Sequence, residues 1–125
     1  MRFLPLLLFL ACSTGTTGPH LYGDGADRGL LEKEAVALDE VLVDEARSGP
    51  VVVKGEIGQV CDQGCWFYLL GQRGVVYVKL DLATGLVVPV SSTKKRAVVR
   101  GVLTSDAEAN ATQGRRLVAE QVMVY

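Results

Sequence analysis

The sequence predicts an all-β fold, and three observations lead to this prediction. Beyond residue 50 the chain is rich in valine, whose branched side chain fits a pleated sheet better than a helix. Its apolar runs are separated by short segments rich in glycine, serine and other turn formers. Gly55 and Gly101 stand inside predicted strands, where glycine commonly marks a bulge or the sharp coiling that closes a small barrel. Together these features predict a small five-stranded OB-like barrel with one or two short helices.

The five strands are expected at residues 51–60, 65–70, 75–80, 97–104 and 116–124. The first of them shows the alternation of a half-buried strand. Val51, Val53 and Ile57 share one face, whereas Lys54 and Glu56 share the other. We therefore expect the valine face to line the inside of the barrel.

Three connections complete the predicted barrel. Residues 71–74, Gly-Gln-Arg-Gly, form the turn between the second and third strands. Residues 81–95 contain Pro89 and too many turn formers for a long helix, so they are expected to be a connection with a short edge strand at residues 86–88. Residues 105–113 begin with a Ser-Asp cap and are expected to form a small helical or irregular excursion.

A short helix is predicted before the first strand. Leu38, Val41 and Leu42 fall at helical spacing in an acidic surround, which predicts a helix over residues 37–44 packed outside the barrel. The Ser-Gly-Pro sequence at residues 48–50 ends it.

The length and net charge of the chain limit the size of its fold and the kinds of partner it can bind. The chain has 125 residues, of which 49% are hydrophobic, enough for one small domain with one core. Its formal net charge is −1, so it lacks the field that draws a protein to nucleic acid. The basic clusters at residues 94–96 and 115–116 are short, as is typical of solvated turns and strand ends. No nucleic-acid partner is expected.

Residues 1–11 have the pattern of a bacterial lipoprotein signal peptide. Arg2 supplies the positive charge, and residues 3–10 form an apolar run too short to span a bilayer as a helix. Ala11 and Cys12 resemble a lipobox, in which the chain is cut before a cysteine that carries lipid, although Phe9 stands where leucine is usual. The alternative is an ordinary signal peptide with a nearby cut.

We expect Cys12 to be the lipidated N-terminus of the mature chain. Ser13 at the second mature position resembles the sorting pattern for the outer membrane, with the domain facing the periplasm. Residues 12–29 begin with a polar run and are predicted to be a flexible leash. The barrel domain is then expected over residues 30–125.

Cys61 and Cys65 flank the connection between the first two strands. If lipid occupies Cys12, they are an even pair in an exported protein and most simply each other's partner. A turn containing Gly64 can bring their Cα atoms within the roughly 4.4 to 6.8 Å that a disulfide needs. A disulfide that closes so small a loop would mainly fix the shape of the turn, and such a loop is easily strained. A structural disulfide, a thiol or metal site and an incidental reduced pair are the alternatives.

A metal site at this pair depends on further ligands. Two thiolates satisfy Cu(I), whereas Zn(II) takes four ligands, of which at least three come from protein even at a catalytic site. The sole histidine, His20, is the candidate third ligand, although a lone histidine beside a leash is more typical of a surface. We expect no cofactor, with Cu(I) or Zn as the alternative.

Trp66, Tyr68 and Tyr77 are candidates for a ligand groove. Strand alternation allows the three to share a face, and OB-like barrels bind ligands through aromatic side chains on their strands. The sequence contains no arrangement typical of a catalytic triad, of paired catalytic carboxylates or of a phosphate-binding glycine loop. A non-enzymatic protein is therefore favoured.

Several segments together resemble a family of exported bacterial proteins. These segments are "HLYGDG", "VVVKGEIGQVCDQGCW", "VVYVKL", "VVP", "RAVVRGV" and "VAEQVMV". They resemble the proteins grouped as domain of unknown function 4920, over most of the chain after the leash. The most specific element is Cys61 and Cys65 followed by Trp66. The resemblance implies an OB-like barrel, frequently lipid-anchored or periplasmic, with no established biochemical activity. Phe67 departs from the methionine common in the family, which weakens the case for a thioether ligand.

Two functions are consistent with these features. The first is a lipid-anchored, non-enzymatic module that binds a small ligand, a soft metal ion or an envelope protein. The second is a thiol-dependent redox or metallochaperone protein acting through Cys61 and Cys65.

Overall fold

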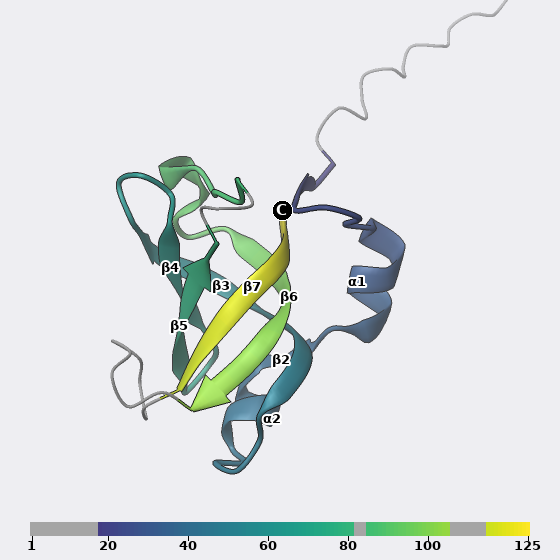
Figure 1. Cartoon of the computed structure of the whole chain (residues 1–125), viewed down its shortest axis with the longest axis vertical. Helices are drawn as coiled ribbons and strands as arrows, with labels where there is room; N and C mark the ends of the chain where they lie inside the picture. Colours follow the sequence, from purple (N-terminus) through teal and green to yellow (C-terminus); the bar gives the residue numbers. More distant parts are fainter. Residues whose placement is uncertain (1–17, 82–84, 106–114) are drawn as a thin grey trace, which may run out of the picture.

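The computed structural model describes residues 18–81, 85–105 and 115–125 (Figure 1). In chain order its elements are β1 (His20–Tyr22), α1 (Arg28–Glu34), β2 (Val36–Ala37), α2 (Leu38–Leu42), β3 (Gly49–Val60), β4 (Trp66–Leu70), β5 (Val75–Leu80), the 3-10 helix η3 (Val90–Ser92), β6 (Arg96–Ser105) and β7 (Arg115–Val124). The five predicted strands correspond to β3, β4, β5, β6 and β7.

These five strands close into a barrel. Around it the order is β3, β4, β5, β7, β6 and back to β3, with antiparallel pairs except for the parallel pair of β5 and β7. Closure depends on β3, which pairs with β6 up to Glu56 and with β4 from Glu56 onwards. The predicted all-β, five-stranded OB-like barrel is therefore confirmed.

The two strand glycines lie where neighbouring backbones approach closely. A Cβ on Gly55 would lie 2.6 Å from the Leu70 carbonyl oxygen, at the point where β3 changes partner. Gly101 lies where the register of β6 and β7 shifts, and a Cβ there would collide with the Val118 carbonyl. A side chain at either position would push the strands apart, which explains why the strand interiors contain glycine.

Both ends of the barrel are covered by short segments that enter the main core. Leu38, Val41 and Leu42 of α2 are buried in it, so the predicted helix exists but covers an end of the barrel instead of lying outside (Figure 1). Leu86 and Val88 enter the same core from the connection between β5 and β6. The predicted edge strand at these residues is wrong, because they form no strand ladder and their burial alone produces the alternating pattern.

The folded part begins before residue 30. Strand β1 pairs with the end of β7, and Asp27 caps α1 by accepting the Leu30 N–H at 3.1 Å. Helix α1 packs on the outside of the barrel, where Leu31 forms a small second core with Val98 and Met123 (Figure 1). Part of the predicted leash therefore belongs to the domain.

Arg115 is a buried structural residue, so its prediction as a solvated strand end is wrong. Its side chain is 2% exposed. The guanidinium donates to the backbone carbonyls of Leu42 (2.8 Å), Asp44 (2.9 Å) and Arg47 (3.4 Å). These bonds satisfy carbonyls at and beyond the C-terminal end of α2 and tie that segment to β7.

Three predictions lie outside the described residues. They are the signal peptide, the lipidation of Cys12 and the excursion after Ser105, which itself ends β6. Within the described part of the chain, no helix is long and apolar enough to cross a membrane.

Candidate functional site

The cysteine turn, residues 61–65, joins β3 to β4. The Gly64 N–H donates to the Cys61 carbonyl (2.8 Å), and the Cys61 N–H donates to the Trp66 carbonyl (2.9 Å). Gly64 has a φ of +74°, and a Cβ there would lie 2.6 Å from the Val88 carbonyl oxygen. Both the conformation and the space therefore require glycine. The Val88 N–H donates to the Gly64 carbonyl (3.1 Å), which fixes the turn against the connection between β5 and β6.

The two thiols of the cysteine turn are in contact. The Sγ atoms of Cys61 and Cys65 lie 2.7 Å apart, and both residues are half-buried. The hydrogen bond from the Cys65 thiol, followed by backbone N–H groups of the turn, lowers the pKa of Cys61. The same hydrogen bond raises the pKa of Cys65. Cys61 is therefore the first of the pair to ionise.

Three aromatic side chains form a cluster on the outer face of β4 and β5. The ring centroid of Trp66 lies 5.5 Å from that of Tyr68 and 5.8 Å from that of Tyr77, and the two tyrosine rings are 5.8 Å apart. Tyr68 lies directly opposite Tyr77 in the strand ladder, and Trp66 follows on the same face. All three residues are half-buried. The three rings pack against one another and stay partly exposed to solvent.

A hollow of about 480 Å³ opens beside this cluster, and we call it the aromatic hollow. Its lining residues come from the cysteine turn, β4, β5, β7 and the residue after β5: Cys65, Trp66, Tyr77, Lys79, Leu80, Asp81, Arg116 and Val118. Lys79 and Arg116 supply two positive charges against the single carboxylate of Asp81. Burial raises the pKa of Tyr77, so its phenol is neutral at physiological pH. The hollow thus combines ring faces, a thiol and two cations.

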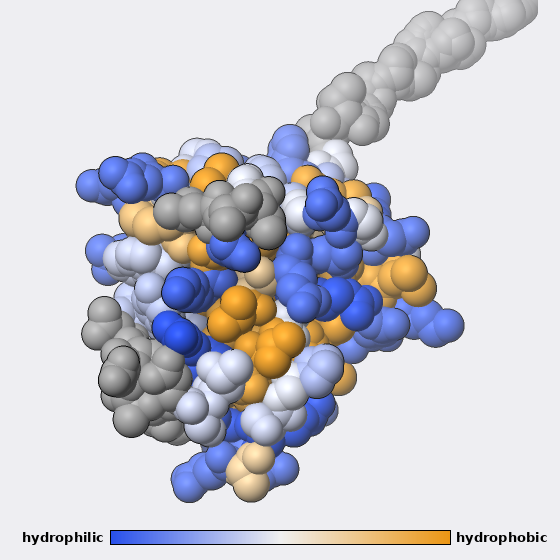
Figure 2. Space-filling view, in the orientation of Figure 1, coloured by the Kyte–Doolittle hydropathy of each residue, from blue (hydrophilic) through white to orange (hydrophobic). Residues whose placement is uncertain are grey.

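The aromatic hollow borders apolar surface on β6 and β7. Val118 of β7 lies opposite Lys79 on one side and Val102 of β6 on the other, and both valines are half-buried. Figure 2 shows hydrophobic side chains gathered over the middle of this face, with hydrophilic side chains around them. A ligand in the hollow would therefore meet cations and apolar surface together.

The structure does not bring His20 together with the cysteines. His20 is exposed at the start of β1, which pairs with the end of β7. Among the described residues no group of three or more His, Cys, Asp and Glu side chains is placed to hold a metal ion. Phe67 is fully buried in the main core.

A soft metal would have to separate the two sulfurs. Because a Zn–S bond is about 2.3 Å long, two thiolates on one tetrahedral metal lie roughly 3.8 Å apart, and on a linear metal further still. The Sγ atoms of Cys61 and Cys65 lie 2.7 Å apart. Closing to the disulfide length of about 2.04 Å requires a smaller movement. The pair can therefore close to a disulfide with a small movement of the sulfurs.

Sequence patterns did not identify Lys79, Arg116 and Val118 as neighbours of the aromatic cluster. Lys79 follows Tyr77 by two residues, so alternation alone could have placed it on this face. Arg116 and Val118 join the site only because β7 pairs in parallel with β5, opposite Tyr77 and Lys79. No local pattern in the sequence predicts the pairing of β5 with β7.

Comparison with protein-family models finds no match for this chain. Comparison with curated proteins finds no match either. The resemblance to the domain of unknown function 4920 proteins stays a prediction.

Proposed function

We propose that the protein is a lipid-anchored binding module of the bacterial cell envelope, and that the aromatic hollow takes a small anion bearing a planar ring. The observation that carries this proposal is the cluster of Trp66, Tyr68 and Tyr77 beside Lys79 and Arg116. Ring faces offer stacking surface, and the two cations offer partners for a carboxylate or phosphate.

The size and charge of the site favour a small ligand over a polymer. A volume of about 480 Å³ lies within the range of roughly 300 to 1,000 Å³ typical of small-molecule sites. Two cations on a chain of net charge −1 do not make the extended positive groove that a nucleic acid requires.

The envelope location in this proposal comes from the N-terminal sequence. Cys12, the lipobox pattern and the polar run after it support a lipid anchor in the outer membrane, with the barrel facing the periplasm. Membership of the domain of unknown function 4920 family would agree with the same location.

The test uses Trp66, the only tryptophan of the chain, as a fluorescent reporter. The probes are benzoate, adenosine monophosphate and glucose 6-phosphate, with benzyl alcohol as the uncharged control. We expect saturable quenching by at least one ring-bearing anion, and a loss of affinity of about tenfold or more in Arg116→Gln. Arg73→Gln, in the exposed turn between β4 and β5, is the matched control and should bind as the wild type does. Equal affinity in wild type and Arg116→Gln would contradict the proposal.

A second candidate function is thiol redox exchange, which the contact between Cys61 and Cys65 favours. The Cys61 thiolate would attack a small-molecule or protein disulfide and release one thiol as a mixed disulfide forms. Cys65, after losing its proton, would then attack the Cys61 sulfur and release the second thiol. The protein dithiol is thereby oxidised by two electrons, and the partner disulfide is reduced to two thiols.

A thiol count on protein purified from the periplasm, together with metal analysis, tests this candidate. Two free thiols that become oxidised reversibly by a small disulfide would support redox exchange. The reduced protein is also titrated with Cu(I) and Zn(II) beside Cys61→Ser/Cys65→Ser. Stoichiometric metal uptake that the double variant loses would instead favour a metallochaperone.

A further inference from the structure

The two cysteines of the cysteine turn differ in their access to the aromatic hollow. Cys65 is among the residues that line this hollow, whereas Cys61 is not. The Leu80 N–H donates to the Cys65 carbonyl at 3.0 Å, which holds Cys65 against the end of β5. The two Sγ atoms nevertheless lie 2.7 Å apart. A molecule bound in the aromatic hollow therefore lies against Cys65 and not against Cys61.

The lining beside Cys65 carries more positive than negative charge. Lys79 and Arg116 line the aromatic hollow, with Asp81 as the one carboxylate of its lining. Lys79 is exposed on β5 and lies opposite Trp66 in the ladder. This excess of positive charge raises the local concentration of an anionic thiol beside the sulfur, relative to a neutral or cationic thiol.

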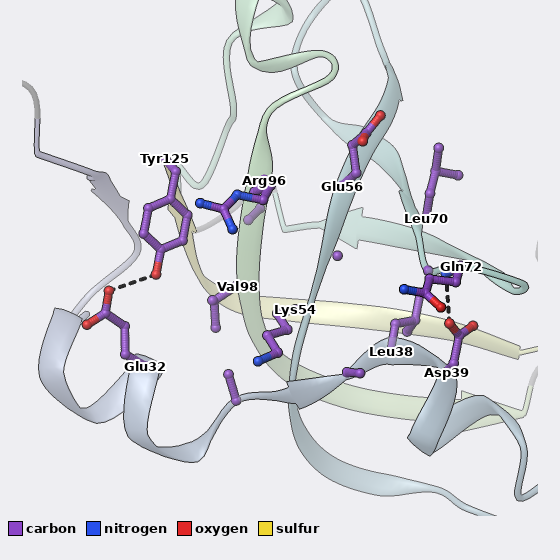
Figure 3. A pocket seen from close by; sticks show the side chains of 15 residues that line it. Glu32, Leu38, Asp39, Lys54, Glu56, Leu70, Gln72, Arg96, Val98 and Tyr125 are labelled. Carbon is purple, nitrogen blue, oxygen red and sulfur yellow. Dashed lines mark hydrogen bonds between the residues drawn. The ribbon is translucent and has the colours of Figure 1, made fainter.

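The other large cavity has neither feature. A cavity of about 810 Å³ is bounded by α1, β2 and α2 on one side and by β3 and β6 on the other, and we call it the helix hollow (Figure 3). Its lining contains three carboxylates, of Glu32, Asp39 and Glu56, against the two cations of Lys54 and Arg96, and it contains no cysteine. Of these two cavities, only the aromatic hollow combines a cysteine with an excess of positive charge.

Cys61 is the sulfur better suited to leave when a disulfide of the pair opens. The Gln63 N–H donates to its Sγ at 3.4 Å. The hydrogen bond from the Cys65 thiol is the largest cause of the lowered pKa of Cys61, and backbone N–H groups of the turn lower it further. The backbone contacts do not need the Cys65 thiol, so they still stabilise a Cys61 thiolate when Cys65 is bonded to another sulfur. Because a thiol of lower pKa leaves faster, attack on the disulfide is favoured at Cys65.

We infer that the aromatic hollow admits a small anionic thiol, which reduces the disulfide of the pair by attacking Cys65. This inference rests on the second candidate function, thiol exchange at the pair, and it names the class of reductant that renews the dithiol. The incoming thiolate forms a bond to the Cys65 sulfur. The bond between the two protein sulfurs breaks, and its electron pair leaves on Cys61 as a thiolate.

A second molecule of the thiol completes the reduction. Its thiolate attacks the sulfur of the first molecule, which releases a small disulfide and the Cys65 thiolate. Two small thiols are thereby oxidised to one disulfide, and the protein disulfide is reduced to two thiols, which take up the protons that the small thiols lost.

The two sulfurs then serve different partners. A partner disulfide that approaches from outside the aromatic hollow is attacked by Cys61, which ionises first. The small thiol approaches from the hollow and attacks Cys65. The oxidising and the reducing partner can therefore use one pair without competing for the same sulfur.

The first experiment measures the charge preference at each sulfur. Cys61→Ser and Cys65→Ser, each in the full chain with Cys12→Ser, retain one cysteine. They react with 2-sulfonatoethyl and 2-(trimethylammonio)ethyl methanethiosulfonate, and mass spectrometry follows the adduct. Each rate is divided by the rate of the same reagent with 2-mercaptoethanol. The resulting preference for the anionic reagent should be at least about threefold larger at Cys65 than at Cys61.

A charge variant tests what sets this preference. In the protein that retains Cys65, Lys79→Gln should lower the preference for the anionic reagent by about threefold or more. Lys33→Gln, on the exposed face of α1, is the matched control and should leave it unchanged. Both lysines are exposed, so both variants should fold. An equal preference at the two cysteines, or no effect of Lys79→Gln, would overturn the inference.

The second experiment follows reduction of the oxidised pair in the full chain with Cys12→Ser. At equal thiolate concentration, 2-mercaptoethanesulfonate should reduce it at least about fivefold faster than 2-mercaptoethanol. Acid quenching and peptide fragmentation should place the mixed disulfide on Cys65. Equal rates, or an adduct on Cys61, would overturn the inference and leave thiol exchange standing. A disulfide that resists both thiols would overturn thiol exchange as well, whereas the ring-anion proposal has a separate readout in Trp66 fluorescence.

Discussion

The cysteine turn and the turn between β4 and β5 both join neighbouring strands, but different groups hold them. In the β4–β5 turn, three backbone N–H groups donate to the carboxylate of Asp39, which comes from α2, 33 residues before the first donor. In the cysteine turn the N–H groups are satisfied locally. Gly64 donates to the Cys61 carbonyl, and Gln63 donates to the Cys61 Sγ at 3.4 Å.

The difference separates a structural turn from a chemically responsive one. We call the three hydrogen bonds to Asp39 the Asp39 latch, and they depend on a carboxylate that stays ionised at neutral pH. The conformation of the β4–β5 turn should therefore not change under physiological conditions. The cysteine turn contains the sulfur that accepts one of its own hydrogen bonds, so oxidation or metal binding at Cys61 alters the groups that shape it. The responsive turn is also the one beside the aromatic hollow.

The largest effect is expected from Gly64→Ala in the cysteine turn. The new Cβ would meet the Val88 carbonyl, and φ is positive, so we expect a loss of about 3 kcal/mol in the free energy of unfolding. Gly85→Ala is the matched control, because φ there is +78° and no atom lies within 4 Å of the new Cβ. It should cost only the conformational part, about 1 kcal/mol. Chemical denaturation measures both, and equal losses would show that the turn is not pressed against Val88.

Asp39→Ala should produce the next largest effect, by breaking the other turn. Three N–H donors lose an ionised acceptor, so we expect a loss of about 2 kcal/mol. Glu40→Ala, at the neighbouring exposed position of α2, should change stability by less than about 0.5 kcal/mol. The reactivity of Cys61 towards iodoacetamide should be the same in both variants and wild type. A changed reactivity would mean that the two turns are coupled.

The two turns should also differ in how their contribution to stability depends on pH, and this effect is smaller. Partial burial raises the pKa of Asp39, but the N–H groups of Gln72, Gly74 and Arg73 outweigh it, so the pKa lies below its ordinary value of about 4. A carboxyl whose pKa is lowered on folding stabilises the protein above its unfolded pKa, and this stabilisation is lost as pH falls through its folded pKa.

The measurement compares wild type with Asp39→Asn by urea denaturation between pH 7 and pH 2. The stability difference should be constant above about pH 5 and should shrink below about pH 4. Glu32, whose pKa is lowered by the Tyr125 hydroxyl and then by Arg28, is present in both proteins and cancels. A difference that stays constant down to pH 2 would contradict the latch.

The barrel could be predicted from the sequence because local residue patterns indicate its strands. Alternation and glycine placed β3 to β7 within two residues of their ends, and the same alternation predicted that Trp66, Tyr68 and Tyr77 can share a face. Helix α1 was missed because one buried side chain, Leu31, fixes it, and a single apolar contact leaves no periodic pattern.

The parts that could not be predicted depend on contacts between distant segments. The burial of Arg115 requires the carbonyls of residues about seventy positions earlier. The position of Arg116 beside Tyr77 requires barrel closure through a parallel pair. The helix hollow likewise exists only because α1 and α2 are placed against β3 and β6.

The most direct test of the contrast between the two turns is the reduction potential of Cys61 and Cys65 in the folded protein. The protein is equilibrated in glutathione buffers, and the free thiols are alkylated and counted by mass spectrometry. Because the pair is partly exposed, the pKa of Cys61 is lowered and the closed loop is small, we expect a potential above about −300 mV and reversible exchange with glutathione. A potential below about −300 mV, with no thiophilic metal bound by the reduced protein, would contradict the account and make the cysteine turn a structural staple.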